Sequence, residues 1–140
     1  LREQLQAHYL KSAGLYTTLR SEEKPLAQRE DAFVQKIREC IEENLADPAF
    51  SIEQLCKTVH LSQRQLQRKL DALTGFSPNQ FIRSIRLQQA KILLRDPDLS
   101  VTAVAYDCGF SDPSYFARVF KQEFALTPQE WREREWSVLN

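Results

Sequence analysis

The chain has 140 residues, 42% of them hydrophobic, which is enough for one compact domain or two small ones. Only three glycines occur and no stretch alternates between apolar and polar residues, so the composition favours an all-α fold. The formal net charge is zero, and no apolar run is long enough to cross a bilayer. The composition therefore excludes a membrane-spanning helix within these residues.

The charge is distributed unevenly along the chain. Residues 60–95 carry seven basic side chains against a single acidic one, Asp71, whereas residues 96–140 carry four basic and eight acidic side chains. A local basic block of this kind is what binding to a phosphate backbone requires. The zero net charge therefore hides a segment that is suited to a nucleic acid.

Residue types that commonly carry chemistry are scattered. Cys40, Cys56 and Cys108 lie far apart on apolar helix faces, which indicates reduced, buried thiols in a cytoplasmic protein. His8 and His60 stand alone, and the sequence contains no Gly-rich phosphate loop and no nucleophile flanked by a base. We therefore expect no catalytic residue, no metal site and no cofactor, and the sequence argues against an enzyme.

The N-terminal part divides into a polar segment and a predicted helix. Residues 1–30 are weakly patterned, and we expect a linker and the end of a missing upstream domain there. Because the first residue is Leu1 rather than Met, we expect a fragment of a longer protein. An amphipathic helix is predicted over residues 31–45, ended by a turn at Asp47-Pro48. Its apolar stripe contains Phe33, Ile37, Ile41 and Leu45.

Two short helices joined by a tight turn come next, which is a helix-turn-helix pattern. Ser51 and Gln54 form a capping box that opens the first helix, which runs to about Val59. The second helix covers residues 61–74, with Ser62 as its N-cap. In each such motif we call the second helix the reading helix.

The first reading helix has a polar, basic face opposite its leucines. That face carries Gln63, Arg64, Gln67 and Arg68, with Lys69 nearby. Arg and Gln side chains make paired hydrogen bonds to the edges of guanine and adenine in a major groove. An isolated helix of this kind is more often a solvated amphipathic helix, so this face alone does not establish DNA binding.

A long connecting helix comes after the first motif. Gly75 stops the reading helix, and Ser77-Pro78 opens a helix to about Leu94, where Asp96-Pro97-Asp98 breaks the pattern. Its 18 residues correspond to about 27 Å at 1.5 Å per residue. A rod of this length can hold two reading helices roughly 34 Å apart, one turn of B-DNA. We therefore expect the reading helices to enter successive major grooves.

The motif occurs a second time further along the chain. Matching positions are 49 residues apart up to the turn and 50 residues apart after it, because the second copy contains one additional residue. Its first helix covers residues 100–108, Gly109 takes the place of His60, and Asp112-Pro113 starts a helix to about Phe124. The matching pairs are Ser51 with Ser100, Leu61 with Phe110, Ser62 with Ser111, Leu66 with Phe116, Leu70 with Phe120 and Pro78 with Pro128. This duplication is the most specific signal in the chain.

The chain from about Phe33 to Arg134 resembles the DNA-binding domain of the AraC/XylS family of bacterial transcription regulators. The resemblance is carried by the segment VAYDCGFSDPSYFARVFKQEFALTPQEWR, residues 104–132, whose spacing is specific to that family. It implies an all-α, homeodomain-like fold of about seven helices, with two helix-turn-helix motifs joined by a long central helix. It also implies sequence-specific binding of double-stranded DNA for transcription regulation, at a promoter site with two boxes about one turn apart.

The resemblance also assigns residues to the DNA contact. Base-reading positions fall on Arg64, Gln67 and Arg68 in the first motif, and on Pro113, Ser114, Tyr115 and Arg118 in the second. Contacts to the DNA backbone are expected from Ser62, Gln63, Ser77, Asn79, Ser111, Lys121, Thr127 and Gln129.

Three departures from the family pattern bear on these assignments. Ala125 stands where the family usually has Gly, so a less sharp helix stop is expected there, and His60 replaces the glycine found at Gly109. Asp112 and Pro113 lower the positive charge at the start of the second reading helix, and Asp112 is expected to cap that helix rather than to accept from cytosine. We predict that the first motif supplies most base discrimination and the second mostly positions the protein.

The run LREQLQAHYL with the polar linker after it is similar to the segment that joins the receiver domain to the output domain in response regulators or hybrid sensor kinases with AraC-type output domains. An upstream receiver or sensor domain is therefore expected, in place of the ligand-binding barrel of more familiar members. No phosphoacceptor Asp constellation occurs here, so a phosphorelay would act on the missing domain. An activator would also contact RNA polymerase, and no residue identifies that surface.

A helical protein–protein interaction module without specific DNA binding is the alternative hypothesis, although it gives no reason for Arg and Gln at matched positions of a duplicated motif. RNA binding is disfavoured, because nothing resembles an aromatic stacking platform on a sheet. The predicted domains are a linker with the end of an upstream domain (1–30), a first subdomain with the connecting helix (31–94), a second subdomain (95–136) and a tail (137–140).

Overall fold

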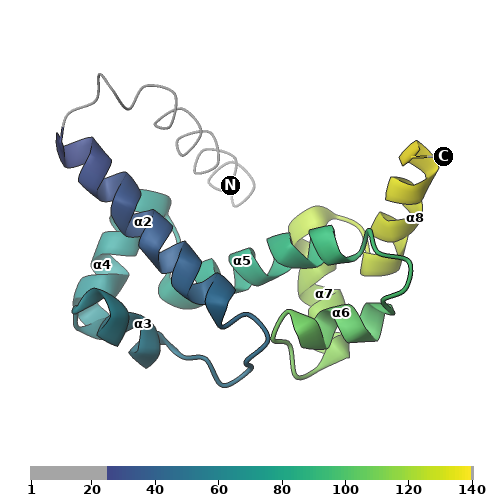
Figure 1. Cartoon of the computed structure of the whole chain (residues 1–140), viewed down its shortest axis with the longest axis horizontal. Helices are drawn as coiled ribbons and strands as arrows, with labels where there is room; N and C mark the ends of the chain where they lie inside the picture. Colours follow the sequence, from purple (N-terminus) through teal and green to yellow (C-terminus); the bar gives the residue numbers. More distant parts are fainter. Residues whose placement is uncertain (1–24, 140) are drawn as a thin grey trace. The chain divides into compact units, whose positions relative to one another are not determined.

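Seven α-helices and no strand occur in residues 25–139, the part of the chain that the computed structural model describes (Figure 1). They are α2 (Pro25–Glu43), α3 (Ile52–Val59), α4 (Gln63–Thr74), α5 (Pro78–Leu93), α6 (Val101–Asp107), α7 (Pro113–Phe124) and α8 (Pro128–Leu139). The prediction of an all-α fold is confirmed. None of the described helices is both long enough and apolar enough to cross a membrane. The expectations for residues 1–24, His8 among them, lie outside the described residues.

The helices group into two compact units. Within the described residues, the first unit contains residues 25–43 and 51–81, and the second contains residues 44–50 and 82–139. The sequence instead assigned the whole connecting helix to the first subdomain. Most of α5 groups with the second unit because its apolar face, which includes Leu87, packs in the core of that unit.

The core of the first unit is built by α2, α3 and α4. Its most deeply buried side chains are Ile37, Ile41, Leu55, Leu66 and Leu70, all with no exposed surface. Helix α2 begins at Pro25, six residues before the predicted start, because proline suits the first turn of a helix. The helix ends at Glu43, so Leu45 does not continue its apolar stripe and packs instead against the core of the second unit.

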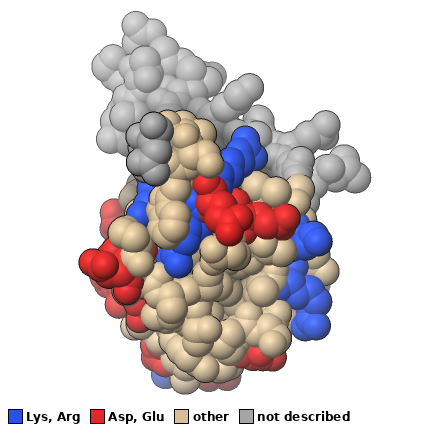
Figure 2. All heavy atoms as spheres, turned by 90° about the vertical axis from the view of Figure 1, so that its right-hand side faces the viewer, with Lys and Arg blue, Asp and Glu red and all other residues tan. Residues whose placement is uncertain are grey.

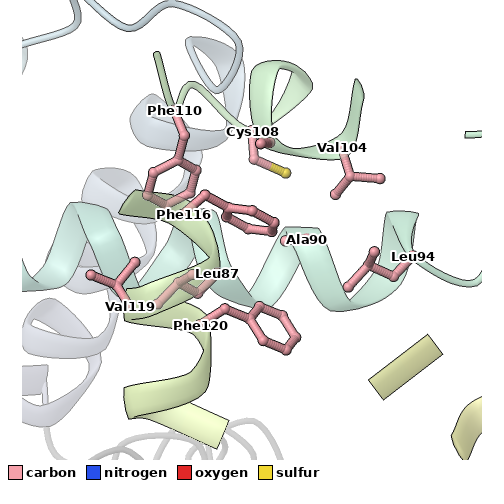
Figure 3. Packing of buried hydrophobic residues seen from close by; sticks show 10 residues of the cluster. Leu87, Ala90, Leu94, Val104, Cys108, Phe110, Phe116, Val119 and Phe120 are labelled. Atoms are coloured by element: carbon pink, nitrogen blue, oxygen red, sulfur yellow. The ribbon is translucent and has the colours of Figure 1, made fainter. Parts of the chain in front are cut away.

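The core of the second unit is rich in aromatic rings. Figure 3 shows Phe116 and Phe120 of α7 pointing toward the face of α5 that carries Leu87 and Ala90. The ring centres of neighbouring pairs lie 5.0 Å apart for Phe110–Phe116, 5.7 Å for Phe116–Phe120 and 4.7 Å for Phe120–Phe124. These tilted and edge-on arrangements are the favourable ones for aromatic pairs. Helices α6 and α7, which form the second helix-turn-helix motif, are packed against α5 in this core.

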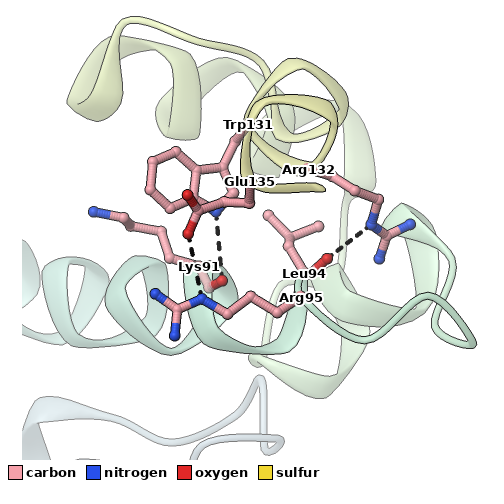
Figure 4. A network of polar contacts seen from close by, with 6 residues as sticks. All are labelled: Lys91, Leu94, Arg95, Trp131, Arg132 and Glu135. Atoms are coloured by element: carbon pink, nitrogen blue, oxygen red, sulfur yellow. Dashed lines mark hydrogen bonds and ion pairs between the residues drawn. The ribbon is translucent and has the colours of Figure 1, made fainter. Parts of the chain in front are cut away.

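Helix α8 is attached to the end of α5 by polar contacts (Figure 4). The Arg132 side chain is 6% exposed and donates to the main-chain carbonyls of Leu94, Asp96 and Leu99, which come after the last turn of α5. Two further contacts are Trp131 Nε1 to the Lys91 carbonyl at 3.4 Å and Arg95 to Glu135 at 3.3 Å. Helix α8 runs to Leu139, into the residues assigned to a tail.

The two helix-turn-helix turns have the same backbone geometry. His60 and Gly109 both adopt the left-handed conformation, with φ of 57° and 87°. In each copy the next residue donates its N–H to the carbonyl five positions back, Leu61 to Cys56 at 3.1 Å and Phe110 to Ala105 at 2.9 Å. This is the hydrogen bond of a Schellman helix end. The match between the two turns that the sequence predicts is therefore present in the structure.

The cysteines are free thiols. Cys40 and Cys108 are buried, whereas Cys56 is only half-buried, so the expectation of three buried thiols is wrong for Cys56. Burial raises the pKa of Cys108 to about 12, with the nearby carboxylate of Asp107 acting in the same direction. A thiol with so high a pKa is protonated at neutral pH and unreactive.

Candidate nucleic-acid interface

The first reading helix, α4, has sharply defined ends. Ser62 Oγ accepts from the N–H of Gln65 at 3.2 Å, and Gln65 Oε1 accepts from the N–H of Ser62 at 2.9 Å, which completes a capping box. Gly75 ends the helix with a φ of 78°. Because Leu66 and Leu70 are fully buried, the opposite face of α4 is presented to solvent.

A surface hollow of about 390 Å³ lies beside this exposed face. Its lining residues are Arg64, Gln67, Arg68, Asp71, Gly75, Ser77 and Gln80. The structure thus brings the three predicted base-reading residues of α4 together with the predicted backbone contact at Ser77. Gln63 is exposed at the start of α4 but does not line the hollow.

Three lining residues, Asp71, Gly75 and Gln80, were not predicted as site residues from the sequence, and Gly75 was expected only to stop the helix. Asp71 lies three positions after Arg68 and four after Gln67, and this helical spacing on one face was an available signal. Gln80 was noticed only through its capping pattern, and the structure shows it at the edge of the same hollow.

The N-terminus of α5 opens onto the hollow. Ser77 and Gln80 form a capping box there, with Gln80 donating its N–H to Ser77 Oγ at 3.2 Å and Ser77 donating its N–H to Gln80 Oε1 at 2.9 Å. The N-terminal end of a helix carries a partial positive charge, which favours a phosphate. Since the Ser77 hydroxyl is engaged in capping, the helix end itself is the feature that suits a phosphate, and Asn79 beside it is exposed.

Lys69 does not belong to the polar face of α4. Its ammonium lies 4.2 Å from the centre of the Phe33 ring, which belongs to α2. This is a cation–π contact, in which the face of the ring attracts the positive charge. The sequence placed Lys69 only near this face, and the structure agrees: the lysine is exposed like Arg64 and Arg68, but its ammonium is turned toward α2.

The second reading helix, α7, begins at Pro113 behind an aspartate cap. Asp112 Oδ1 accepts from the N–H of Ser114 at 2.9 Å, so the prediction that Asp112 caps this helix is confirmed. Ser114 and Arg118 are exposed. The Arg118 guanidinium carbon lies 5.4 Å from the centre of the half-buried Tyr115 ring, which restricts the orientations of the arginine.

The remaining predicted backbone contacts occupy different settings. Ser111 and Lys121 are exposed, and the cap of α7 is Asp112 although Ser111 is the residue that matches Ser62. Thr127 forms a capping box with Glu130, and these hydrogen bonds lower the pKa of Glu130. Gln129 donates to Glu133 at 3.2 Å, along the exposed side of α8.

The face shown in Figure 2 carries acidic and basic side chains interspersed over a broad uncharged surface. It therefore lacks the continuous basic surface that would bind a phosphate backbone without regard to sequence. Among the described residues, no group of three or more His, Cys, Asp or Glu side chains is placed to hold a metal ion.

Ala125 ends α7 as a glycine would. It adopts the left-handed conformation with a φ of 65°, and its N–H donates to the Lys121 carbonyl at 2.8 Å. The helix stops at Phe124. The expectation of a less sharp stop is therefore wrong. Ala125 adopts the left-handed conformation and makes this hydrogen bond although its Cβ makes that conformation unfavourable.

Part of the predicted basic block is used inside the second unit. Arg86 is 9% exposed and donates to the main-chain carbonyls of Gly109 at 2.7 Å and Asp47 at 2.9 Å. Lys91 lies 4.4 Å from the Phe124 ring centre and 4.6 Å from that of Trp131. Burial lowers the pKa of both cations. The block of seven cations thus overstates the charge available to a phosphate backbone.

Comparison with known proteins places this geometry in a family. The family model described as "Helix-turn-helix domain" matches residues 55–134, which include part of α3, both reading helices, α5 and α6. The chain belongs to the AraC/XylS-type helix-turn-helix family. Family membership identifies it as a sequence-specific DNA-binding domain for transcription regulation.

Curated relatives of the domain occur in longer proteins. The chain is 33% identical over 112 residues to the HTH-type transcriptional activator RhaR of Enterobacter sp. (strain 638), a match that covers 80% of this chain and 39% of the activator. It is 30% identical over 105 residues to Histidine kinase P4 of Formosa agariphila, covering 75% of this chain and 8% of the kinase. The chain therefore spans well under half of either relative.

Solved structures share the fold. One is the DNA-binding domain of AdpA, a global transcriptional factor, in complex with a target DNA, with a TM-score of 0.67, 28% identity and coverage of 76% of this chain and 94% of that one. Another is the C-terminal domain of the two-component response regulator yesN from Fusobacterium nucleatum, with a TM-score of 0.62, 29% identity and coverage of 69% and 93%.

Proposed function

We propose that this domain reads a promoter site with two boxes about one helical turn apart, one box for each helix-turn-helix motif. The observation that carries the proposal is the equivalence of the two motifs. Both turns have a residue in the left-handed conformation at the same position, His60 in one and Gly109 in the other, and the residue after it makes the same backbone hydrogen bond. Each turn is followed by a capped reading helix with an exposed polar face. Helix α5, with 16 residues and a length of about 24 Å, joins the motifs along the chain.

In the first motif, we assign base reading to Arg64, Gln67 and Arg68. All three are exposed, line the hollow and have donors that suit guanine and adenine edges. The N-terminus of α5, at Ser77, takes a phosphate of the DNA backbone, with Ser62, Gln63 and Asn79 as the further backbone contacts of this motif.

In the second motif, base reading is assigned to Ser114, Tyr115 and Arg118. Backbone contacts are assigned to Ser111, Lys121, Thr127 and Gln129. The first motif supplies most of the base discrimination, because α4 presents two arginines and a glutamine whereas α7 begins behind the negative charge of Asp112. The second motif mostly positions the protein on the duplex.

We further propose that the domain is the output part of a cytoplasmic two-component protein, in which an upstream receiver or sensor domain receives the signal and the output activates transcription by contacting RNA polymerase. The similarity to a histidine kinase and to the C-terminal domain of a two-component response regulator supports this proposal. The similarity to the transcriptional activator RhaR supports activation rather than repression.

Selection from a random duplex pool tests the proposed site. The 140-residue chain is used to enrich bound duplexes, and the affinities of enriched and unenriched duplexes are compared at two salt concentrations. Two enriched boxes with centres about one helical turn apart and a large affinity ratio support the proposal. A single box would mean that the second motif makes no direct readout. No enrichment, with binding that disappears as salt rises, would favour a protein–protein interaction module.

A further inference from the structure

Arg86 is a cation buried beneath the second helix-turn-helix turn. Its side chain extends from α5, and its Nη1 and Nη2 atoms donate to two main-chain carbonyls, those of Gly109 and Asp47. The third nitrogen, Nε, is buried and has no hydrogen-bond partner in the part of the chain that the structure describes. The guanidinium therefore has two strong, directed contacts and one unsatisfied donor.

The two carbonyls belong to segments far apart in the sequence. Gly109 is the turn residue between α6 and α7, while Asp47 lies in residues 44–50, which are part of the second unit. A Cβ at Gly109 would lie 2.3 Å from the carbonyl oxygen of Leu45 and 2.7 Å from Cζ of Arg86. The turn is thus closely fitted between Arg86 and the main chain at Leu45.

The energetics favour a geometric role for this arginine. Replacing a buried ionic group by an apolar group of similar volume is often neutral or stabilising, so a buried charge with an unsatisfied nitrogen is weak evidence for stabilisation. The planar fork of arginine, in contrast, fixes two acceptors at once in a defined direction. An apolar side chain of the same size could fill the space but could not set this direction.

We propose that Arg86 is a positioning residue for DNA recognition: it fixes the turn at Gly109 and thereby the orientation in which Ser114 and Arg118 of α7 reach the second box. We assign Arg86 no DNA contact of its own, because its side chain is buried and both Nη atoms donate within the protein. This inference rests on the proposed function of α7 at the second box.

The test separates the contribution of the second box from overall affinity. The 140-residue chain is titrated with the best duplex of the random-pool selection and with the same duplex in which the second box is scrambled. The Kd for the scrambled duplex divided by the Kd for the intact duplex measures the contribution of the second box. We expect Arg86→Met to lower this ratio by about tenfold, the size of one lost base contact. Affinity for the scrambled duplex is expected to stay within about twofold, since that binding uses the other motif.

Val104→Ala is the matched control. Val104 is fully buried in the same core and offers no donor to either carbonyl, so this variant loosens the second unit without removing the fork. All variants are compared at a temperature where thermal unfolding shows each of them to be folded. A lower ratio for Arg86→Met than for Val104→Ala supports the positioning role, and equal ratios for the two variants overturn it.

Arg86→Lys tests whether the effect comes from the paired guanidinium donors or from the positive charge. If Arg86→Met does not fold, Arg86→Lys is compared with Val104→Ala in its place. Lysine keeps the positive charge but not the planar pair of donors, so we expect it to restore only part of the ratio. Full recovery with lysine overturns the proposal. A wild-type ratio near one would instead contradict the proposed function of the second motif, independently of Arg86.

Discussion

The ammonium of Lys69 lies 4.2 Å from the centre of the Phe33 ring, so this lysine is turned toward α2 although it comes directly after Arg68 on the reading helix. Successive residues of an α-helix point about 100° apart, since a turn contains 3.6 residues. Arg68 is therefore free to line the hollow while its neighbour packs on an aromatic ring. The two adjacent cations of α4 have different roles.

This difference predicts opposite outcomes for two neighbouring substitutions. Arg68→Ala should lower affinity for the selected duplex about tenfold or more and reduce selectivity, because a bidentate base contact is lost. Lys69→Ala should change affinity by less than about threefold and lower the free energy of unfolding by about 0.5–1 kcal/mol. Fluorescence anisotropy and urea unfolding measure the two effects. An Arg68→Ala protein with wild-type affinity and selectivity would refute the assignment of Arg68.

Among residues 25–139, two residues other than glycine have a left-handed backbone, and replacing each with glycine should stabilise the protein. His60→Gly and Ala125→Gly each remove a Cβ from a residue with positive φ, at 57° and 65°. We expect each change to raise the free energy of unfolding by about 1 kcal/mol, although glycine also adds freedom to the unfolded chain. Urea unfolding at constant m-value measures the gain. Unchanged or lower stability in both variants would contradict this account of the two turns.

Gly109→Ala should have the opposite effect, and a larger one. A side chain there meets the positive φ of 87° and also the Leu45 carbonyl at 2.3 Å. We expect destabilisation by more than about 2 kcal/mol, since main chain cannot move aside as a flexible side chain can. Gly75→Ala, at a φ of 78°, is the comparison and should cost about 1 kcal/mol. Equal losses at both glycines would show that the contact with Leu45 has no energetic effect.

The capping box of α8 should make stability depend on pH. Hydrogen bonds from Thr127 lower the pKa of Glu130 below its ordinary value of 4.5. Because the folded-state pKa is the lower one, the box contributes stability above pH 4.5, and this contribution is lost as the pH falls through the folded-state pKa. Glu130→Gln keeps an acceptor but does not titrate.

We therefore expect wild type to exceed Glu130→Gln in thermal unfolding midpoint at neutral pH, with the difference shrinking toward about pH 3. Other carboxylates titrate in both proteins and cancel from the comparison. A difference that stays constant over this range would show that ionised Glu130 is not the stabilising form.

Much of the candidate site is determined by short-range patterns. The caps at Ser62, Ser77, Asp112 and Thr127 are hydrogen bonds between residues two or three positions apart, so residue types and spacing predict them directly. The exposed polar face of α4 is predicted in the same way from the period of its buried leucines. The hollow was not predicted, because it also depends on how the N-terminus of α5 is placed beside α4.

The sequence by itself determined the helical composition and the caps at Ser62, Ser77, Asp112 and Thr127, because these depend on contacts within about five residues. The duplication of the motif was visible directly as a repeated pattern of residues. Only the tertiary structure decided which cations remain available to DNA. Lys69 and Lys91 are held over aromatic rings, and Arg86 is directed to carbonyls 23 and 39 residues away in the sequence. The physical reason is that a long cationic side chain is stabilised by whichever ring or carbonyl the fold brings within reach, and sequence spacing does not reveal that partner.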